Sequence, residues 1–275
     1  MFELLKVTEL SENVKEYVFK AEKVVKHAKP GQFVILRVDE EGERVPFTLC
    51  DMDKDAGTIT LLVQTIGATT KKMSMLKVGD SISDIVGPLG NATDLNFANK
   101  ILLVSGGIGG AVTYPQAKYL HSQNKIVDNI MGSRTKDLLI YKDNFDKYSR
   151  NNYVMTDDGS YGEKGFVTNK LEELLSKESY DVVFAVGPLR MMQAVCNVTK
   201  KFNTKTIVSM NSIMVDGTGM CGGCRLTVDG KTKYACVDGP EFDGHLVDFD
   251  EAIARSGIYR DRRSPFSPLP PGRSH

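Results

Sequence analysis

The sequence predicts three successive units: an antiparallel β-barrel, an α/β domain built on a parallel sheet, and a small cysteine-rich module. The first part contains short alternating runs broken by glycine and proline turns, which is typical of antiparallel barrels. Later, continuous apolar strands alternate with helical stretches, which indicates a parallel sheet. Three of the five cysteines then gather in one glycine-rich segment. We expect these units at residues 1–97, 98–210 and 211–254, followed by a tail at 255–275.

Length and charge narrow the classes of function. A chain of 275 residues can form two domains with their own cores and one small module. Its 35 basic and 35 acidic residues balance, so no overall field attracts nucleic acid or an anionic membrane. We find no N-terminal apolar h-region and no apolar run of about 18 residues, so we expect neither a signal peptide nor a membrane span. Free thiols suit a reducing compartment, and we expect a cytoplasmic protein.

In the first unit, five runs are predicted to be strands. They are Val14–Phe19, Gln32–Val38, Phe47–Asp51, Thr58–Gln64 and Ser81–Val86. A short helix fits Thr69–Leu76, just before the turn at Gly79.

Two segments of this unit carry groups that suit a nucleotide. The first contains Arg44, Pro46, Phe47 and Thr48, and the second contains Gly67, Thr69 and Thr70. An arginine at a strand start can meet a pyrophosphate, while Thr48 offers a hydroxyl and a backbone N–H to a flavin ring. Backbone donors at the start of the short helix create an anion site. Alone, each segment has a plainer interpretation, namely an edge strand begun by proline and a threonine helix cap.

The second unit alternates strands and helices. Its predicted strands are Lys100–Ser105, Ile126–Gly132, Asn152–Thr156, Val182–Val186 and Thr206–Met210. Its predicted helices follow Gly110 to about His121 and then occupy Lys142–Tyr148, Phe166–Ser176 and Met191–Lys201. This alternation predicts βαβ units in a parallel sheet.

Glycine-bearing turns follow several of these strands, where ligands of parallel sheets bind. The turns contain Gly106, Gly107 and Gly109, then Arg134, then Gly187, Pro188 and Met191, and Asp158 follows a further strand. The first turn lacks the complete dinucleotide fingerprint, because Val112 takes the place of the third glycine. Arg134 is either a phosphate contact or a solvated charge, and Met191 fits a core position as well as a ligand contact.

The cysteine-rich segment has the spacing D-x4-C-x2-C-x11-C, formed by Asp216, Cys221, Cys224 and Cys236. Plant-type iron–sulfur proteins have C-x4-C-x2-C followed by a distant cysteine, so Asp216 stands in the first ligand position. Intervening glycines let backbone N–H groups approach the sulfides. The same four side chains could hold structural zinc. A disulfide is a poor interpretation, because three clustered thiols leave one unpaired.

With these residues assembled, the chain resembles the ferredoxin–NADP reductase superfamily. The resemblance rests on the P-F-T element, the G-G-I-G and G-P-L-R-M-M turns, and the cysteine module. Within it, the chain is similar to electron-transfer subunits of dihydroorotate dehydrogenase. It is more similar to the family of small (alpha) subunits of electron-bifurcating NADH-dependent reduced ferredoxin:NADP+ oxidoreductases, also known as sulfide dehydrogenase subunits. The phrases MVDGTGMCGGCR and ACVDGPEFDGHLVDFDE carry this second likeness.

The resemblance implies specific ligand contacts. It implies FAD at Arg44, Pro46, Phe47, Thr48, Val63, Gly67, Thr69 and Thr70. It implies NAD(H) at Gly106, Gly107, Gly109, Arg134, Asp158, Gly187, Pro188 and Met191. It implies a [2Fe–2S] cluster on Asp216, Cys221, Cys224 and Cys236, with cysteine in the first position in dihydroorotate dehydrogenase subunits. Two positions depart from the superfamily pattern: Val45 stands where the flavin motif has arginine, and Val112 stands where the nucleotide loop has proline.

We therefore expect an electron-transfer flavoprotein that passes electrons between NAD(H), FAD and the cluster to a larger flavin and iron–sulfur subunit in an obligate hetero-oligomer. Ferredoxin and NADP(H) are reached indirectly, through that partner. We expect the partner to contact residues 216–236, with Phe242, Leu246 and Val247 beside them. The alternatives are the subunit of dihydroorotate dehydrogenase and, in another class, a zinc-bearing binding module without redox function.

Two further expectations concern nucleotide preference and the tail. Near Gly132 we find only Arg134 and Lys136 as cations, offset by Asp137, so we expect NADH to be preferred over NADPH. The basic, proline-rich stretch Arg260–His275 shows no periodicity, and we interpret it as an interaction tail or vector-derived sequence outside the fold.

Overall fold

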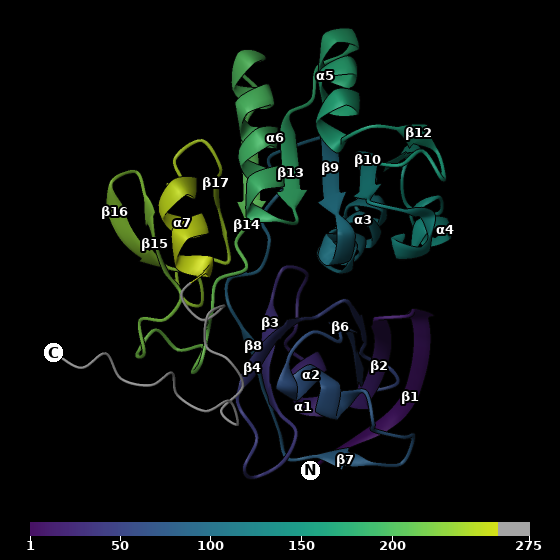
Figure 1. Ribbon diagram of the computed structural model, residues 1–275, viewed down its shortest axis with the longest axis vertical. Coiled ribbons are helices and arrows are strands. Elements are labelled where there is room, and N and C mark those ends of the chain that lie inside the picture. Colours follow the sequence, from purple (N-terminus) through teal and green to yellow (C-terminus); the bar gives the residue numbers. More distant parts are fainter. Residues whose placement is uncertain (258–275) are drawn as a thin grey trace, which may run out of the picture.

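The computed structural model describes residues 1–257 and contains the three predicted units in order (Figure 1). The barrel lies at one end of the molecule, the sheet domain lies at the other, and the cysteine module sits beside the sheet domain. The predicted fold class is therefore confirmed. Our interpretation of Arg260–His275 concerns residues outside the described part.

The barrel consists of two antiparallel sheets. The larger has the order β5-β6-β2-β1-β7 and the smaller the order β4-β3-β8. These strands are β1 (Phe2–Ser11), β2 (Val14–Lys20), β3 (Phe33–Arg37), β4 (Val45–Thr48), β5 (Asp51–Asp53), β6 (Thr58–Gln64), β7 (Ser81–Ile82) and β8 (Asp84–Leu89), and the helices are α1 (Glu22–Val25) and α2 (Ala68–Met73). Alternate residues such as Tyr17 and Phe19 point inward and are fully buried. Each such side chain contributes on the order of 2 kcal/mol to the core.

The barrel strands differ from the prediction in three places, one of which is Ser81–Val86: it is divided at Ser83 into β7 and β8, which belong to different sheets. Strand β1, the longest in this unit, was not predicted, because only Leu4 of its ten residues is buried and the run lacks a clear alternation. The single strand predicted at Phe47–Asp51 is divided at Leu49 and Cys50 into β4 and β5, which belong to different sheets. Both residues at this corner are fully buried, and the chain turns there from one sheet to the other.

The second unit is a seven-stranded sheet with the order β12-β11-β10-β9-β13-β14-β17. Its strands are β9 (Lys100–Gly106), β10 (Ile126–Ser133), β11 (Asn151–Thr156), β12 (Glu163–Lys164), β13 (Val182–Val186), β14 (Thr206–Ser209) and β17 (Glu241–Asp243), and its helices are α3 (Gly110–Ser122), α4 (Lys142–Phe145), α5 (Val167–Lys177) and α6 (Leu189–Lys201). Strands β9 to β14 pair in parallel, as predicted. Helices α3 and α4 pack on one face and α5 and α6 on the other.

The cysteine module contains a hairpin of β15 (Arg225–Val228) and β16 (Lys231–Tyr234), followed by α7 (Phe249–Ser256). Its apolar side chains Leu226, Phe249 and Ala252 belong to the same buried cluster as the α5–α6 face of the sheet. The module is therefore anchored to the seven-stranded sheet, beside α6 and β14 (Figure 1).

The segment before α7 contains β17 as an antiparallel edge strand paired with β14. Phe242, the middle residue of β17, is only 9% exposed. Our expectation that Phe242 contributes to a partner interface is therefore wrong, because its pairing with Val208 turns the ring into the core. Cys50 and Cys196 are buried free thiols. Within residues 1–257, the helices are too short or too polar to cross a bilayer.

Candidate functional site

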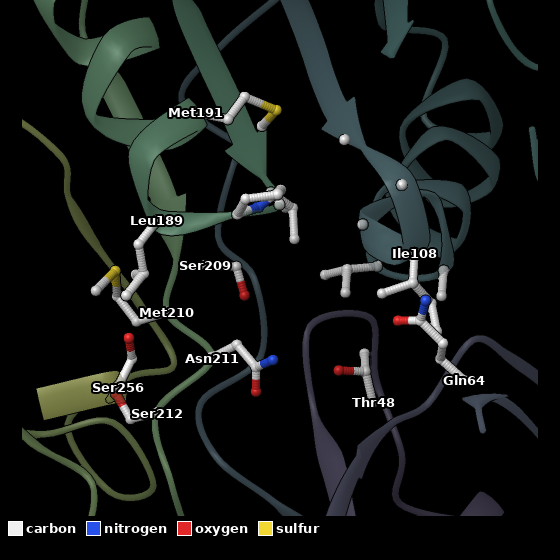
Figure 2. A pocket seen from close by; sticks show the side chains of 18 of the residues that line it. Thr48, Gln64, Ile108, Leu189, Met191, Ser209, Met210, Asn211, Ser212 and Ser256 are labelled. Atoms are coloured by element: carbon white, nitrogen blue, oxygen red, sulfur yellow. The ribbon is translucent and has the colours of Figure 1, made fainter. Parts of the chain in front are cut away.

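A cavity of about 2590 Å³ separates the barrel from the second unit, the predicted nucleotide domain, and extends to the cysteine module. A typical pocket for one small ligand measures about 300–1,000 Å³, so this space can hold more than one nucleotide-sized group. The polar ends of Thr48, Ser209 and Asn211 point into its middle, between Ile108 and Leu189 (Figure 2). Residues from all three units therefore face the same volume.

The barrel wall of the cavity is formed mainly by β4 and the residue before it. Arg44, Pro46, Phe47 and Thr48 all line the space. Their strand is held in place by pairing with β3, which puts Phe33 opposite Thr48. The structure thus brings the predicted P-F-T element and its neighbouring arginine to one surface.

The second barrel segment reaches the cavity only through Thr70. Its hydroxyl oxygen accepts the backbone N–H groups of Ile66 and Gly67 at 3.0 and 2.9 Å, which closes the turn before α2. Gly67 and Thr69 lie beside the cavity without lining it. Val63 is fully buried in the barrel core, and its neighbour Gln64 faces the cavity instead.

The nucleotide domain provides the opposite wall from the turns after β9 and β13. Gly106 ends β9 and Gly107 and Gly109 follow it, while Gly187, Pro188 and Met191 follow β13. A Cβ atom on Gly109 would overlap the carbonyl oxygen of Val186, so the two turns approach each other as closely as glycine allows. Met191 lines the cavity, whereas Met192 beside it is fully buried.

At the far end of this wall, one of the two predicted contact residues lines the cavity and the other does not. Arg134 lines the cavity, but Asp157 takes the place expected for Asp158. The carboxylate of Asp158 instead accepts hydrogen bonds from the hydroxyl and backbone N–H of Ser160, which lower the pKa of Asp158.

Sequence reasoning missed Gln64, Phe166, Ser209 and Asn211, which also line the cavity. Gln64 and Ser209 are the last residues of β6 and β14, and Asn211 follows shortly after. Polar residues at strand ends are the signal that indicates such positions. Phe166 immediately precedes α5 and is 64% exposed, which is unusual for a phenylalanine.

The four predicted cluster ligands form two pairs. Cys224 and Cys236 are buried, and their sulfur atoms are 3.2 Å apart. Asp216 lies against Cys221, because its carboxylate accepts the backbone N–H of Cys221 at 2.7 Å. Cys221 is exposed and lines the cavity. No group of three or more potential ligand side chains converges as for a single metal ion anywhere within residues 1–257.

Two pairs fit a two-iron cluster, since each iron of a [2Fe–2S] core takes two protein ligands. Hydrogen bonds from the N–H groups of Thr218 and Cys221 lower the pKa of Asp216, which favours the anionic form that a ligand needs. Burial and the adjacent Cys224 raise the pKa of Cys236. Binding of a cation at this pair must therefore displace a proton, as thiolate coordination requires.

Three family models match consecutive parts of the chain. Residues 1–93 match the oxidoreductase FAD-binding domain, and residues 103–197 match the oxidoreductase NAD-binding domain. Residues 211–248 match the iron–sulfur cluster binding domain of dihydroorotate dehydrogenase B. The protein is thus an FAD-, NAD(H)- and iron–sulfur-dependent oxidoreductase of the ferredoxin-reductase type. The cysteine module accordingly binds an iron–sulfur cluster rather than structural zinc.

Similar whole proteins narrow this class to a family. The dihydroorotate dehydrogenase B electron transfer subunit homolog of Thermotoga maritima is 44% identical over 260 residues, covering 94% of this chain and 92% of that protein. An uncharacterized protein in the adh 3′ region of Clostridium beijerinckii is 46% identical over 269 residues, covering 94% and 91%. The chain belongs to the family of dihydroorotate dehydrogenase B electron transfer subunits and their homologues.

A solved structure resembles almost the whole chain. It comes from work on flavin-based electron bifurcation by the NADH-dependent reduced ferredoxin–NADP oxidoreductase. The TM-score is 0.89 at 43% identity, covering 95% of this chain and 94% of the other.

Proposed function

We propose that this chain is the small, electron-transferring subunit of an electron-bifurcating NADH-dependent reduced ferredoxin–NADP oxidoreductase, working in the cytoplasm. The observation that carries the proposal is Asp216, which occupies the position where the resemblance gives cysteine to dihydroorotate dehydrogenase subunits. The full-length likeness to the bifurcating oxidoreductase supports it. We assign Asp216, Cys221, Cys224 and Cys236 as ligands of a [2Fe–2S] cluster.

The lining residues divide between two cofactors. We assign FAD to the barrel wall, with Arg44, Thr48 and Gln64 as its polar contacts, and NAD(H) to the turns after β9 and β13. Bound FAD supplies the exchange between two-electron and one-electron transfer, because nicotinamide carries a hydride and the cluster accepts one electron. The protein's contribution is to position both groups across one cavity, which lowers the entropy cost of transfer.

The cluster end of the cavity connects this reaction to a partner. Cys221 lines the cavity on one side, and around the same loop Val215 and Met220 are 53% and 89% exposed. Exposed apolar groups around a redox centre favour contact with another protein, because such interfaces bury aromatic and aliphatic side chains. We propose that Val215, Met220 and the 46% exposed Leu246 contact a larger flavin and iron–sulfur subunit.

Purification of the complex from its native host tests the proposal. We expect the chain to co-purify with a larger subunit that carries flavin and iron–sulfur centres. The complex should reduce NADP+ only when NADH and reduced ferredoxin are both supplied. Rapid NADP+ reduction by NADH alone, or purification of the chain without any partner, would contradict it.

The names of the relatives favour a second candidate, the electron transfer subunit of a dihydroorotate dehydrogenase. In that case the purified complex oxidises dihydroorotate with NAD+ and has no requirement for ferredoxin. The same preparation therefore separates the two functions, since each is measured with a substrate that the other does not use.

A further inference from the structure

Two arginines of the cysteine module contact the loop that carries Cys221 and Cys224. Arg225, the first residue of β15, donates from Nη1 to the carbonyl oxygen of Gly222 at 3.3 Å. Arg255, in the last turn of α7, donates from Nη2 to the carbonyl oxygen of Gly223 at 3.4 Å. Its Nε also donates to the carbonyl oxygen of Arg225 at 3.1 Å. Two successive carbonyl groups of the ligand loop therefore face positive charge.

The peptide group between Gly222 and Gly223 links Arg225 to the sulfur atom of Cys221 through two hydrogen bonds. In a trans peptide the C=O and N–H groups point in opposite directions. The carbonyl of Gly222 faces Arg225, and the N–H of Gly223 in the same peptide donates to Sγ of Cys221 at 3.4 Å. Gly222 has φ of 65°, a backbone conformation that favours glycine. One peptide group therefore lies between the guanidinium group of Arg225 and the sulfur atom of Cys221, and it is hydrogen-bonded to both.

We propose that Arg225 and Arg255 raise the reduction potential of the iron–sulfur cluster through these peptides, acting as positioning residues that do not bind iron. The proposal rests on the assignment of Cys221 as a ligand. When one electron enters the cluster, one ferric ion becomes ferrous and the cluster becomes more negative by one charge. N–H···S hydrogen bonds and nearby cations stabilise that state. Both arginines also line the cavity that we assign to FAD and NAD(H).

A plainer role for these arginines is that of solvated charges. A cation without a hydrogen bond to the ligand loop would act on the cluster only through the solvent, where salt screens the interaction. Lys231 at the start of β16 provides the comparison, because it is an exposed cation of the same hairpin. Replacing Lys231 by glutamine removes the same charge as replacing Arg225, while leaving the Gly222–Gly223 peptide untouched.

The test is the midpoint potential of the cluster in the full chain with FAD and cluster bound, followed by electron paramagnetic resonance at controlled potential. We expect Arg225→Gln to shift the potential downward, by about tenfold in the reduction equilibrium, which is about 59 mV for a one-electron couple. Arg225→Lys should recover part of the shift, and Lys231→Gln should cause little. An unchanged potential in Arg225→Gln, or an equal shift in Lys231→Gln, overturns the proposal.

A second readout separates tuning from damage to the fold. Resonance Raman bands of the iron–thiolate bonds should change frequency in D2O in the wild type, and this change should shrink in Arg225→Gln if the N–H···S bond weakens. If Arg225→Gln does not load a cluster, Arg255→Gln takes its place, because it leaves the Arg225 contact in position. A Cys221→Ala protein that keeps a wild-type cluster would refute the ligand assignment itself, whatever the arginine variants do.

Discussion

The nucleotide domain and the cysteine module hold their functional groups in different ways. In the nucleotide domain the binding turns begin where β9 and β13 end, and Ile101 to Val104 and Val182 to Ala185 are fully buried. In the cysteine module, residues 211–224 contain no helix or strand, and hydrogen bonds to Asp216 and the cysteine sulfurs organise the ligand loop. The first site is therefore shaped by the protein core, whereas the second depends on the group it binds.

The hairpin and helix α7, unlike the ligand loop at residues 211–224, are held by apolar packing. Leu226, Phe249 and Ala252 pack into the same core as α6. Loss of the cluster should therefore disturb residues 216–224 and leave the hairpin and α7 in place. Variants in the nucleotide domain and in the cysteine module test this difference.

The largest effect is expected from Cys224→Ala, which removes one ligand of the buried pair. Visible absorption of the cluster should disappear, while FAD stays bound because no barrel contact changes. Hydrogen exchange should rise in residues 216–224 and remain slow in β9 and β13. Cys196→Ala is the matched control, since Cys196 is a buried thiol outside the ligand loop. Unfolding of the whole nucleotide domain in Cys224→Ala would show that the contrast is false.

The next effect concerns Asp216, the carboxylate that we propose as a cluster ligand. Asp216→Cys should retain the cluster, because thiolate is the softer ligand for iron, but its spectrum and potential should change. Asp216→Ala should alter both or lose the cluster. Asp238→Ala serves as control, since that carboxylate contacts the Tyr234 backbone in the same module. A wild-type spectrum and potential in Asp216→Ala would exclude Asp216 as a ligand.

The two sites also differ in how much of each could be predicted from the sequence. The apolar runs of β9 and β13 and the cysteine spacing are local signals, so the sheet and the four ligand candidates could be read directly. Strand β17 could not, because three residues are stable as a strand only when paired with β14. Ser209 and Asn211 were missed for a similar reason, since only the closure of barrel and sheet makes them cavity walls. Local patterns predict elements, whereas contacts between distant segments complete the site.

In the nucleotide site, Gly109→Ala should weaken NADH binding by about tenfold or more, or about 1.4 kcal/mol. The added Cβ would overlap the backbone of Val186, which cannot move without shifting the sheet. Gly110→Ala is the control, because its Cβ would lie 3.7 Å from the nearest atom, the carbonyl oxygen of Ile140. NADH binding is measured from the concentration dependence of flavin reduction. Equal affinities in the two variants would mean that this turn does not contact the nucleotide.

Nucleotide preference should respond less strongly. We expect faster flavin reduction by NADH than by NADPH, because Asp157 lines the cavity near Arg134 and would repel a 2′-phosphate. Asp157→Asn should narrow the difference between the two nucleotides, whereas Asp158→Asn should not, since Asp158 is held by Ser160 outside the cavity lining. Stopped-flow reduction at equal nucleotide concentrations measures both. Faster reduction of the wild type by NADPH would reverse the assignment.

The smallest expected effect is a change of stability with pH, and it arises where the barrel meets strand β17 and helix α3. Glu241 of β17 accepts a hydrogen bond from the hydroxyl of Thr93 at the end of the barrel, and Gln116 of α3 donates to the same hydroxyl. Burial raises the pKa of Glu241 to about 7, although the bond from Thr93 opposes this. Between the unfolded pKa of about 4.5 and pH 7, the folded protein therefore holds a proton that the unfolded chain has released.

Stability consequently falls as pH rises through this window, by at most about 1.4 kcal/mol per pH unit, and levels off above pH 7. Glu241→Gln should remove this slope from the free energy of unfolding measured with denaturant between pH 5 and 8. Glu178→Gln is the control, because its hydrogen bonds with Lys100 and Tyr180 lower the pKa of Glu178 to about 2 and its contribution is constant across the window. An unchanged slope in Glu241→Gln would mean that the junction of barrel, sheet and module carries no titrating carboxyl, and that the module's attachment is insensitive to pH in this range.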